Sequence, residues 1–355
     1  MSEVISPSVL GTVGNTIPKL TICIPTLNRA NELRTSLESI SRQEASGVEI
    51  VIVDGGSTDD TFKVIGAFKR SGLNIRTYES KTKNGVDRDI LQSVELATAK
   101  YCWLFSDDDV MEEGGLQHVL NAIDSNPDVR GISTNYVAYD SKLEYTIATV
   151  PAFAYGRIRN SCILSGREEA FAGLGIHFGF ISCQVVERES WMQIAESEDL
   201  SSQCNAWIIV YMIGKMLKPQ SRWYYLHHVC VGYRSGNDSF IARLGVIKRQ
   251  EITHLHFAHT IGALFSKGSK AYRSVFSILL RDRMPRTLAV LKAKGISRET
   301  QLELYKMYFR EYSSYPSFWI RVVPIFAAPN WLLISTRRYY LAWRRWRSAS
   351  DKTVE

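Results

Sequence analysis

Three adjacent carboxylates, Asp107, Asp108 and Asp109, follow the apolar run YCWLF. Like charges this close repel one another, so the cluster is unfavourable unless a cation compensates it. Adjacent hard oxygen ligands suit Mg²⁺ or Mn²⁺, which completes its coordination shell with phosphate and water. We therefore expect Asp108 to bind a metal ion, and Asp109 to act as a ligand or to support one. A solvated turn, where aspartate is common, is the alternative interpretation.

The elements that would position this cluster alternate between short apolar runs and amphipathic stretches. Strands are expected within residues 20–27, 48–61, 73–80 and 100–109, and helices over 28–44, from about Asp60, and over 86–99. Ser57 or Thr58 is expected to cap the second helix. This order predicts an α/β fold with a mostly parallel central sheet flanked by helices. Ligands bind outside the carboxyl ends of such strands, where the polar clusters PTLNR, DGGS and SDDD stand.

Composition limits the partners and the compartment. The chain has 355 residues, of which 45% are hydrophobic and 22% charged, as in a globular protein with a sizeable core. Its formal net charge of +7 favours anionic partners such as nucleotides, nucleic acid or an anionic membrane. The six cysteines include no CxxC pair and indicate buried thiols of a reducing compartment. No uninterrupted apolar window of about 18 residues occurs, so we expect no transmembrane helix.

Three motifs in order, TICIPTLNRANELRTSLESI, EIVIVDGGSTDDT and YCWLFSDDD, resemble the nucleotide-sugar domain of family 2 glycosyltransferases with the GT-A fold. This resemblance covers roughly residues 20–125. NGVDRDILQSVELATAKYCWLFSDDD and VGYRSGNDSF are similar to the bacterial abequosyltransferase group, which acts in O-antigen assembly, and extend it to about residue 240. The resemblance implies transfer of a sugar, such as a dideoxyhexose, from a nucleoside diphosphate to a lipid-linked saccharide.

The resemblance also implies roles for polar residues at matching positions. The implied nucleotide-sugar-binding residues are Pro25, Thr26, Asn28, Arg29, Asp54, Arg88, Asp107, Arg234, Asn237 and Asp238. The PTLNR residues would form the loop under the nucleotide, Asp54 would lie beside the base and ribose, and Asp107 would reach the ribose hydroxyls. Arg88 would face the diphosphate, and the YRSGNDSF loop would close over the donor. An ordinary surface arginine and a plain turn are the alternatives for these last two.

Two positions depart from the family pattern. Many UDP-sugar enzymes of the family carry a second aspartate where this chain has Gly55, and that carboxylate can accept the N3–H of uracil. Cytosine has a bare acceptor at N3, which a carboxylate would repel, so the glycine favours a CDP-sugar over a UDP-sugar. Ser106 stands where the first aspartate of the usual DxD-type motif would be, so the acidic cluster is displaced by one position.

The catalytic base is harder to assign. Inverting members of the family usually carry a Glu-Asp pair at the start of a helix facing the acceptor, where Asp takes the proton of the acceptor hydroxyl. The matching helix is expected over residues 205–215, but QCN at its start offers no useful base. Glu198 and Asp199 lie several residues earlier, and His177 is a third candidate, although a lone histidine in an apolar stretch is more often a core residue. A retaining transfer, in which the leaving phosphate takes the proton, needs no base.

The chain divides into four expected parts: a flexible leader (1–18), a GT-A domain (19–240), a helical region (241–317) and an aromatic-basic tail (318–355). Within the GT-A domain, the nucleotide-sugar half covers about residues 20–125 and the acceptor half about residues 126–240. The tail combines tryptophan and arginine, and its two prolines prevent one continuous spanning helix. Such a tail favours an anionic membrane surface, so we expect a peripheral enzyme on the cytoplasmic face of the bacterial inner membrane. A terminal helix packed on the domain is the alternative.

Two other functions fit parts of the sequence. A metal-dependent nucleotidyltransferase also needs acidic ligands on an α/β sheet, but this chain lacks the expected Gly-rich, Arg/Lys-bearing loop after its first strand. A basic nucleic-acid-binding protein would account for the charge and the tail. It would leave the three carboxylates unexplained, because without a metal they repel phosphate. We therefore expect a nucleotide-sugar donor and no nucleic acid.

Overall fold

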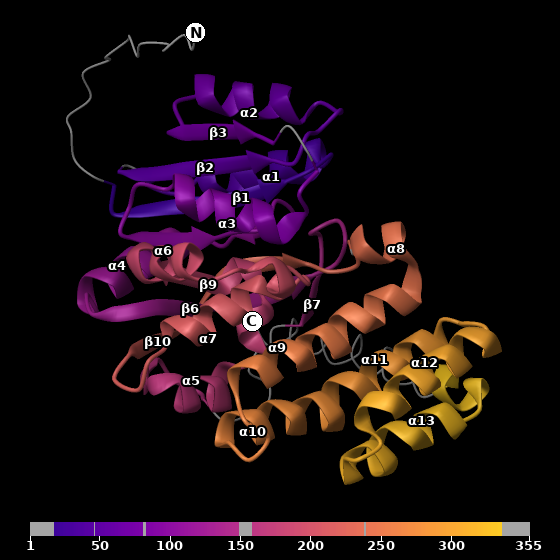
Figure 1. The fold of residues 1–355 in the computed structure, drawn as a ribbon. Helices are drawn as coiled ribbons and strands as arrows, with labels where there is room; N and C mark the ends of the chain where they lie inside the picture. The colour runs from indigo at the N-terminus through magenta and orange to yellow at the C-terminus, as the bar shows by residue number, and fades with distance from the viewer. Residues whose placement is uncertain (1–17, 46, 81–82, 149–157, 238, 336–355) are drawn as a thin grey trace, which may run out of the picture.

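The computed structural model describes residues 18–45, 47–80, 83–148, 158–237 and 239–335 (Figure 1). Its first part consists of β1 (Leu20–Thr26), α1 (Ala30–Ser41), β2 (Val48–Asp54), α2 (Thr61–Arg70), β3 (Ile75–Glu79), α3 (Val86–Leu96) and β4 (Tyr101–Leu104). All residues of β1 and β2 are buried, as expected for parallel strands that helices cover on both faces. The α/β fold expected from the sequence is confirmed.

The sheet continues through the second part of the chain. Its elements are β5 (Val110–Met111), α4 (Gly115–Ser125), β6 (Val129–Tyr139), β7 (Thr146–Ala148), β8 (Cys162–Ser165), α5 (Gly166–Leu174), β9 (Gln184–Glu187), α6 (Arg188–Ser197), α7 (Ile208–Met216) and β10 (Arg222–Arg234). Within the described residues, ten strands form one sheet with the order β3-β2-β1-β4-β9-β6-β10-β5, while β7 pairs with β6 and β8 with β10. The first four strands run parallel, and β9 joins β4 antiparallel.

Helices form the end of the molecule opposite β3 (Figure 1). They are α8 (Ser239–Gln250, with a kink at Gly245), α9 (Phe257–Leu264), α10 (Lys270–Ile278), α11 (Met284–Ala293), α12 (Arg298–Tyr312) and α13 (Val323–Ala327). Three π-helical segments, Glu251–His256, Leu279–Arg283 and Phe318–Val322, join some of them. In the part of the chain that the structure describes, no helix is long and apolar enough to cross a membrane.

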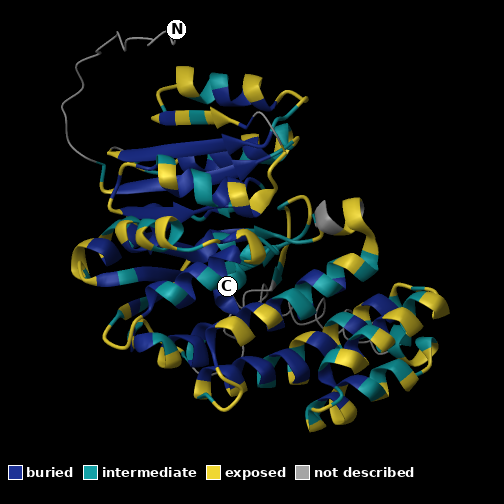
Figure 2. Ribbon diagram, in the orientation of Figure 1, coloured by how far each residue is buried: buried dark blue, intermediate teal, exposed yellow. Residues whose placement is uncertain are grey.

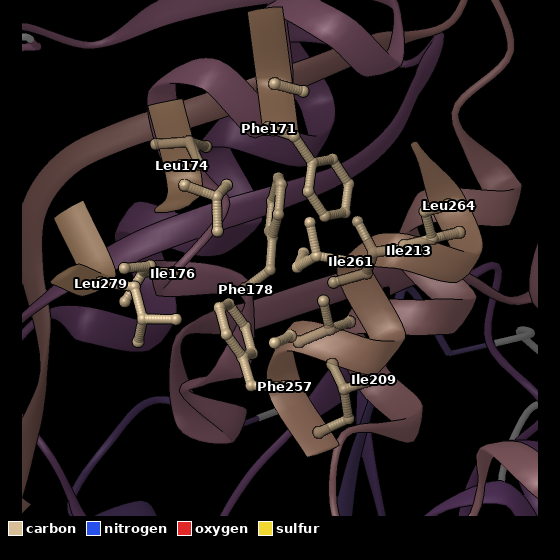
Figure 3. Packing of buried hydrophobic residues seen from close by; sticks show 14 of the residues in the cluster. Phe171, Leu174, Ile176, Phe178, Ile209, Ile213, Phe257, Ile261, Leu264 and Leu279 are labelled. Carbon is tan, nitrogen blue, oxygen red and sulfur yellow. The ribbon is translucent and has the colours of Figure 1, made fainter. Parts of the chain in front are cut away.

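Two apolar cores cover the two faces of the sheet, because successive side chains of a strand point to opposite sides. In β1, Ile22 and Ile24 join one core with α1, while Cys23 joins the other with α3. This second core continues into the helical end, where Phe171, Phe178 and other side chains from α5, α7 and α9 interlock (Figure 3). Buried residues of α10 and α11 belong to this core, and Figure 2 shows buried segments in both the sheet and the helical end. The helical end is therefore part of the same folded unit.

The start of the expected tail belongs to this core. Phe318 and Val322 are fully buried, and the Nζ of Lys292 donates to the carbonyl oxygens of Ile325, Phe326 and Ala328 at 2.9, 2.7 and 2.7 Å. These bonds satisfy carbonyl groups at the end of α13, which a helix terminus leaves unpaired. Residues 336–355, with most of the tail's arginines, and residues 1–17 of the expected leader lie outside the described residues.

Candidate active site

The carboxyl ends of β1 and β4 bring the PTLNR and SDDD motifs together. The two strands pair in parallel, and the N–H of Phe105 donates to the carbonyl of Cys23. Beyond them, the Thr26 hydroxyl donates to Asp107 Oδ2 at 2.8 Å, although 81 residues separate the two. The motifs therefore form one site at the sheet edge where parallel strands present ligands.

Arg29 partly neutralises the acidic cluster. Its Nη2 donates to Asp108 Oδ2 at 2.7 Å, and its Nε lies 3.4 Å from Asp107 Oδ1. Burial lowers the pKa of Arg29, but the charges of both carboxylates outweigh this effect and raise it, so the guanidinium stays charged. Part of the repulsion within the cluster is thus relieved by an arginine of the first motif.

Asp109 is held by the protein on both carboxylate oxygens. Its Oδ2 accepts a hydrogen bond from the Ser182 hydroxyl at 2.6 Å, and its Oδ1 accepts one from the backbone N–H of Arg234 at 3.1 Å. Burial, reinforced by the charge of Asp108, raises the pKa of Asp109 to about 8. For Asp109, these contacts favour the supporting role over that of a direct metal ligand.

The end of β2 lies beside the PTLNR loop. Ser57 donates to Asp54 Oδ1 through its N–H at 2.9 Å and its hydroxyl at 2.6 Å. Asn28 adopts the left-handed region with φ 54°, and its Oδ1 accepts from the N–H of Thr58 at 2.7 Å. The expectation that Ser57 or Thr58 caps α2 is therefore wrong: both bond to this loop, and Asp60 is the residue before the helix. Among the described residues, Asp54 Oδ2 has no hydrogen-bond partner despite its burial.

The end of β10 and the loop after it contact Asp108. Arg234 Nε donates to the Asp108 carbonyl at 2.9 Å, and Asn237 Nδ2 donates to Asp108 Oδ2 at 3.3 Å. Arg234 Nη2 is buried and finds no partner in the described part of the chain. A buried N–H without an acceptor is unfavourable, and a bound anion would satisfy it. Asp238, also expected in this loop, lies outside the described residues.

Residues 21–193, which carry β1 to β4 and most of these contacts, match the model of the family described as Glycosyl transferase family 2. The protein carries a family 2 glycosyltransferase domain over these residues. It is 25% identical to abequosyltransferase RfbV of Salmonella typhimurium over 282 residues, which cover 74% of this chain and 80% of that protein.

Solved structures show that this glycosyltransferase has the GT-A fold. Residues 1–349 of S. aureus TarS in complex with UDP-GlcNAc give a TM-score of 0.55 at 14% identity, covering 82% of this chain and 87% of that one. The mannosyltransferase PcManGT of Pyrobaculum calidifontis, in complex with GDP-Man and Mn²⁺, gives 0.52 at 15% identity, covering 94% and 91%. At these identities the likeness concerns the fold alone.

In this glycosyltransferase a cavity of about 230 Å³ opens between α3 and the end of α6. Its lining residues are Arg88, Leu91, Glu95, Met192, Ala195, Glu198, Asp199 and Leu200. Arg88 stands in the first turn of α3 and donates to the Ser201 hydroxyl at 3.2 Å. The structure thus brings Arg88 together with two of the base candidates rather than with the aspartate cluster.

The three base candidates differ in their surroundings. Glu198 accepts from Lys215 at 2.6 Å and from the Tyr211 hydroxyl at 2.8 Å, and these bonds outweigh the effect of burial and lower its pKa. Hydrogen bonds from Ser201 lower the pKa of Asp199, which is exposed to solvent. His177 is buried, its Nε2 lies 2.7 Å from the Thr134 carbonyl, and burial lowers its pKa to about 4. These surroundings favour a packing role for His177.

The carboxylates offer a divalent ion few ligands of their own. Among the described residues, no group of three or more His, Cys, Asp or Glu side chains converges so that it could hold a metal ion. Asp108 is partly exposed, and within the described part of the chain Asp107 Oδ1 has only the longer contact to Arg29. This donor set fits a Mg²⁺ or Mn²⁺ ion held by one or two carboxylates together with substrate phosphates.

Some site neighbours could not be expected from the sequence. Asp87 Oδ2 accepts from the N–H of Ala206 at 2.6 Å and so fixes the segment before α7. Ala206 has φ 75°, which is why α7 starts at Ile208, later than expected. An aspartate early in a helix can be explained from the sequence by its favourable interaction with the helix dipole. Its hydrogen-bond partner could not be predicted in this way, because Ala206 lies 119 residues from Asp87. For Ser182, which holds Asp109, the sequence carries no signal.

Proposed function

We propose that this glycosyltransferase moves a sugar from a nucleoside diphosphate sugar to a lipid-linked saccharide during assembly of a bacterial surface polysaccharide such as O-antigen. The main support for this proposal is that Thr26 and Arg29 contact Asp107 at the carboxyl ends of β1 and β4. The name of the Salmonella relative supports a dideoxyhexose as the transferred sugar. The nucleotides named with the solved neighbours support a nucleoside diphosphate as the carrier.

The donor pocket is proposed to use the chain's own polar groups as follows. Asp107 accepts from the ribose hydroxyls, and Asp54, with its unpartnered oxygen, accepts from the base or ribose. Arg234, with its unpartnered N–H, donates to the diphosphate, and Asn237 closes the loop over it. Asp108 would hold Mg²⁺ or Mn²⁺, and Asp109 would support it. When bound, the divalent ion supplies positive charge against the leaving diphosphate.

For the acceptor, we propose the cavity between α3 and α6. Its lining combines the apolar side chains of Leu91, Met192 and Ala195 with the charged ones of Arg88, Glu198 and Asp199. In an inverting transfer, Asp199 or Glu198 would take the proton as the acceptor oxygen bonds to the anomeric carbon and the bond to the diphosphate breaks. Of the two, Asp199 is the better candidate because Glu198 is already paired with Lys215.

The cytoplasmic face of the inner membrane is the proposed place of action. Trp319, Ile320 and Trp331 expose large apolar side chains at the helical end, and the basic residues after position 335 would add attraction to anionic lipid. Membrane association would bring the enzyme to a lipid-linked acceptor without a spanning helix.

A nucleotide titration tests the proposal. Labelled CDP, UDP, GDP and dTDP are titrated against the protein with Mn²⁺ and with EDTA. We expect at least one nucleoside diphosphate to bind, to bind more tightly with Mn²⁺, and to bind best as CDP. If none bound under either condition, the proposed donor site would be wrong.

A further inference from the structure

Arg29 contacts the carboxylate oxygens of Asp107 and Asp108 that accept no hydrogen bond from a hydroxyl group. Asp107 Oδ2 accepts from the Thr26 hydroxyl at 2.8 Å, and Asp108 Oδ1 accepts from the Ser106 hydroxyl at 2.5 Å. The remaining oxygens, Asp107 Oδ1 and Asp108 Oδ2, face the Arg29 guanidinium at 3.4 and 2.7 Å. A metal ion that binds this cluster must therefore compete with the Arg29 guanidinium for these oxygens.

We infer that Arg29 is the resident counter-ion of the cluster and that it leaves Asp108 for the diphosphate when a divalent metal binds together with the nucleotide. The inference rests on the proposed function, because it deepens the role of the same donor site. It makes Arg29 a positioning residue that links metal binding to nucleotide binding.

The backbone around Arg29 is fixed while its side chain can move. The Arg29 carbonyl accepts from the N–H of Leu33, and the N–H of Ala30 donates to Asp59 Oδ2 at 3.1 Å. The preceding residue, Asn28, is bonded to Ser57 and Thr58. Among the described residues, the two carboxylates alone hold the side chain, and 17% of it is exposed. Rotation about its side-chain bonds would therefore free Asp108 without unfolding the loop.

The chemistry of the two cations favours such an exchange. The planar guanidinium matches two phosphate oxygens at once, so a diphosphate gives Arg29 a new partner. Of its partners among the described residues, Asp108 Oδ2 would then keep only the neutral Asn237 amide at 3.3 Å, which a metal can displace more easily than a paired arginine. Metal alone must compete with Arg29, and nucleotide alone must approach three carboxylates. Each ligand should therefore increase the affinity for the other by the same factor.

Direct Mn²⁺ binding tests this exchange. Free Mn²⁺ is measured by electron paramagnetic resonance during titration of the full chain, with and without saturating nucleoside diphosphate. For the wild type we expect weak binding of Mn²⁺ alone and roughly tenfold tighter binding with nucleotide. Arg29→Gln should bind Mn²⁺ alone roughly tenfold more tightly than wild type, and the effect of nucleotide should shrink.

Two further variants keep the test decisive. Arg34→Gln removes an equal charge from an exposed position in α1, the helix that follows Arg29, and should bind Mn²⁺ like wild type. Arg29→Lys keeps the positive charge but lacks the planar guanidinium group. Its affinity for Mn²⁺ alone should lie between those of wild type and Arg29→Gln, and it provides a second test if Arg29→Gln folds poorly. If wild type binds Mn²⁺ with nucleotide but Arg29→Gln and Arg29→Lys bind Mn²⁺ alone no better than wild type, the exchange is wrong while the donor site stands. If nucleotide binds and Mn²⁺ binds under no condition, Arg29 is a permanent counter-ion, and both the exchange and the proposed metal fail.

Discussion

The Asp89 carboxylate lies against the position at which a side chain on residue 55 would begin. A Cβ built on Gly55 would lie 3.2 Å from Asp89 Oδ2, a contact so close that one of the two groups would have to shift. Asp89 comes from the first turn of α3, and Asp54, next to Gly55, is close enough for its charge to act on Asp89. Although residue 55 is a glycine, Asp89 therefore supplies a second carboxyl group in this part of the site.

This arrangement predicts a pH dependence of stability. Burial, followed by the charge of Asp54, raises the pKa of Asp89 to about 6, above the value of about 3.9 in an unfolded chain. The folded state therefore holds this proton more tightly, so the contribution of Asp89 to the free energy of unfolding is full below pH 4. It is lost as the pH rises through 6.

The isosteric change Asp89→Asn should remove this effect. We expect it to raise the free energy of unfolding at pH 7.5 by about 1–2 kcal/mol relative to wild type, and the difference to vanish near pH 4. Urea unfolding at both pH values measures it. Glu95→Gln, an exposed site on the same helix, is the matched control and should show no such difference. A gain in stability that was the same at both pH values would contradict the assigned pKa shift.

The preference for CDP over UDP stays a prediction. Gly55 removes the aspartate that can accept uracil N3–H, and an Asp89 carboxyl that keeps its proton near pH 6 can donate to the bare N3 of cytosine. We expect CDP to bind several-fold more tightly than UDP, with the largest ratio at or below pH 6. Competition against a labelled nucleotide at pH 5.5 and pH 8 measures the ratio. UDP binding tenfold more tightly than every other nucleotide would overturn the argument from Gly55.

The sequence predicted the parts of the site that depend on regular structure. Parallel strands place their carboxyl ends on one edge, so the proximity of Thr26 and Asp107 followed from two apolar runs and the chain order. Contacts between irregular segments did not follow. The bonds of Asp109 to Ser182, and of Asp87 to Ala206, depend on how loops pack after the sheet forms. Helix ends were displaced for local reasons, such as the left-handed conformations of Asn28 and Ala206.

The central aspartate gives a direct activity prediction. Asp108→Asn keeps the shape of the side chain but removes half of the charge that Arg29 and a divalent ion would face. Because a metal-assisted step is worth several kcal/mol, we expect turnover to fall at least about a hundredfold. The melting temperature should stay within a few degrees of wild type, since Asp108 is partly exposed.

Turnover and melting temperature are measured together to separate the two effects. Asp124→Asn, an exposed aspartate paired with Lys19, serves as the control for loss of one carboxylate. Near-normal turnover of Asp108→Asn would remove this residue from the active site.

The last prediction concerns membrane binding. Truncation after Ser317 would be a poor test, because it removes the buried Phe318 and Val322 and leaves the Lys292 ammonium without its three carbonyl partners. Truncation after Ser335 instead removes five arginines and two tryptophans while keeping this packing. Each arginine near an anionic surface is worth about 1 kcal/mol, so the full chain should dock reversibly.

Co-sedimentation with anionic and neutral vesicles measures the effect of that truncation. We expect the shortened chain to bind anionic vesicles at least about tenfold more weakly, and the binding of the full chain to weaken as salt screens its charges. The double change Trp319→Ala and Trp331→Ala in the full chain should lower binding to both vesicle types, because exposed indole rings favour the headgroup region irrespective of charge. Transfer to a lipid-linked acceptor should slow more than transfer to a short soluble one. If the full and shortened chains sediment alike at every salt concentration, the segment after Ser335 does not bind the enzyme to lipid.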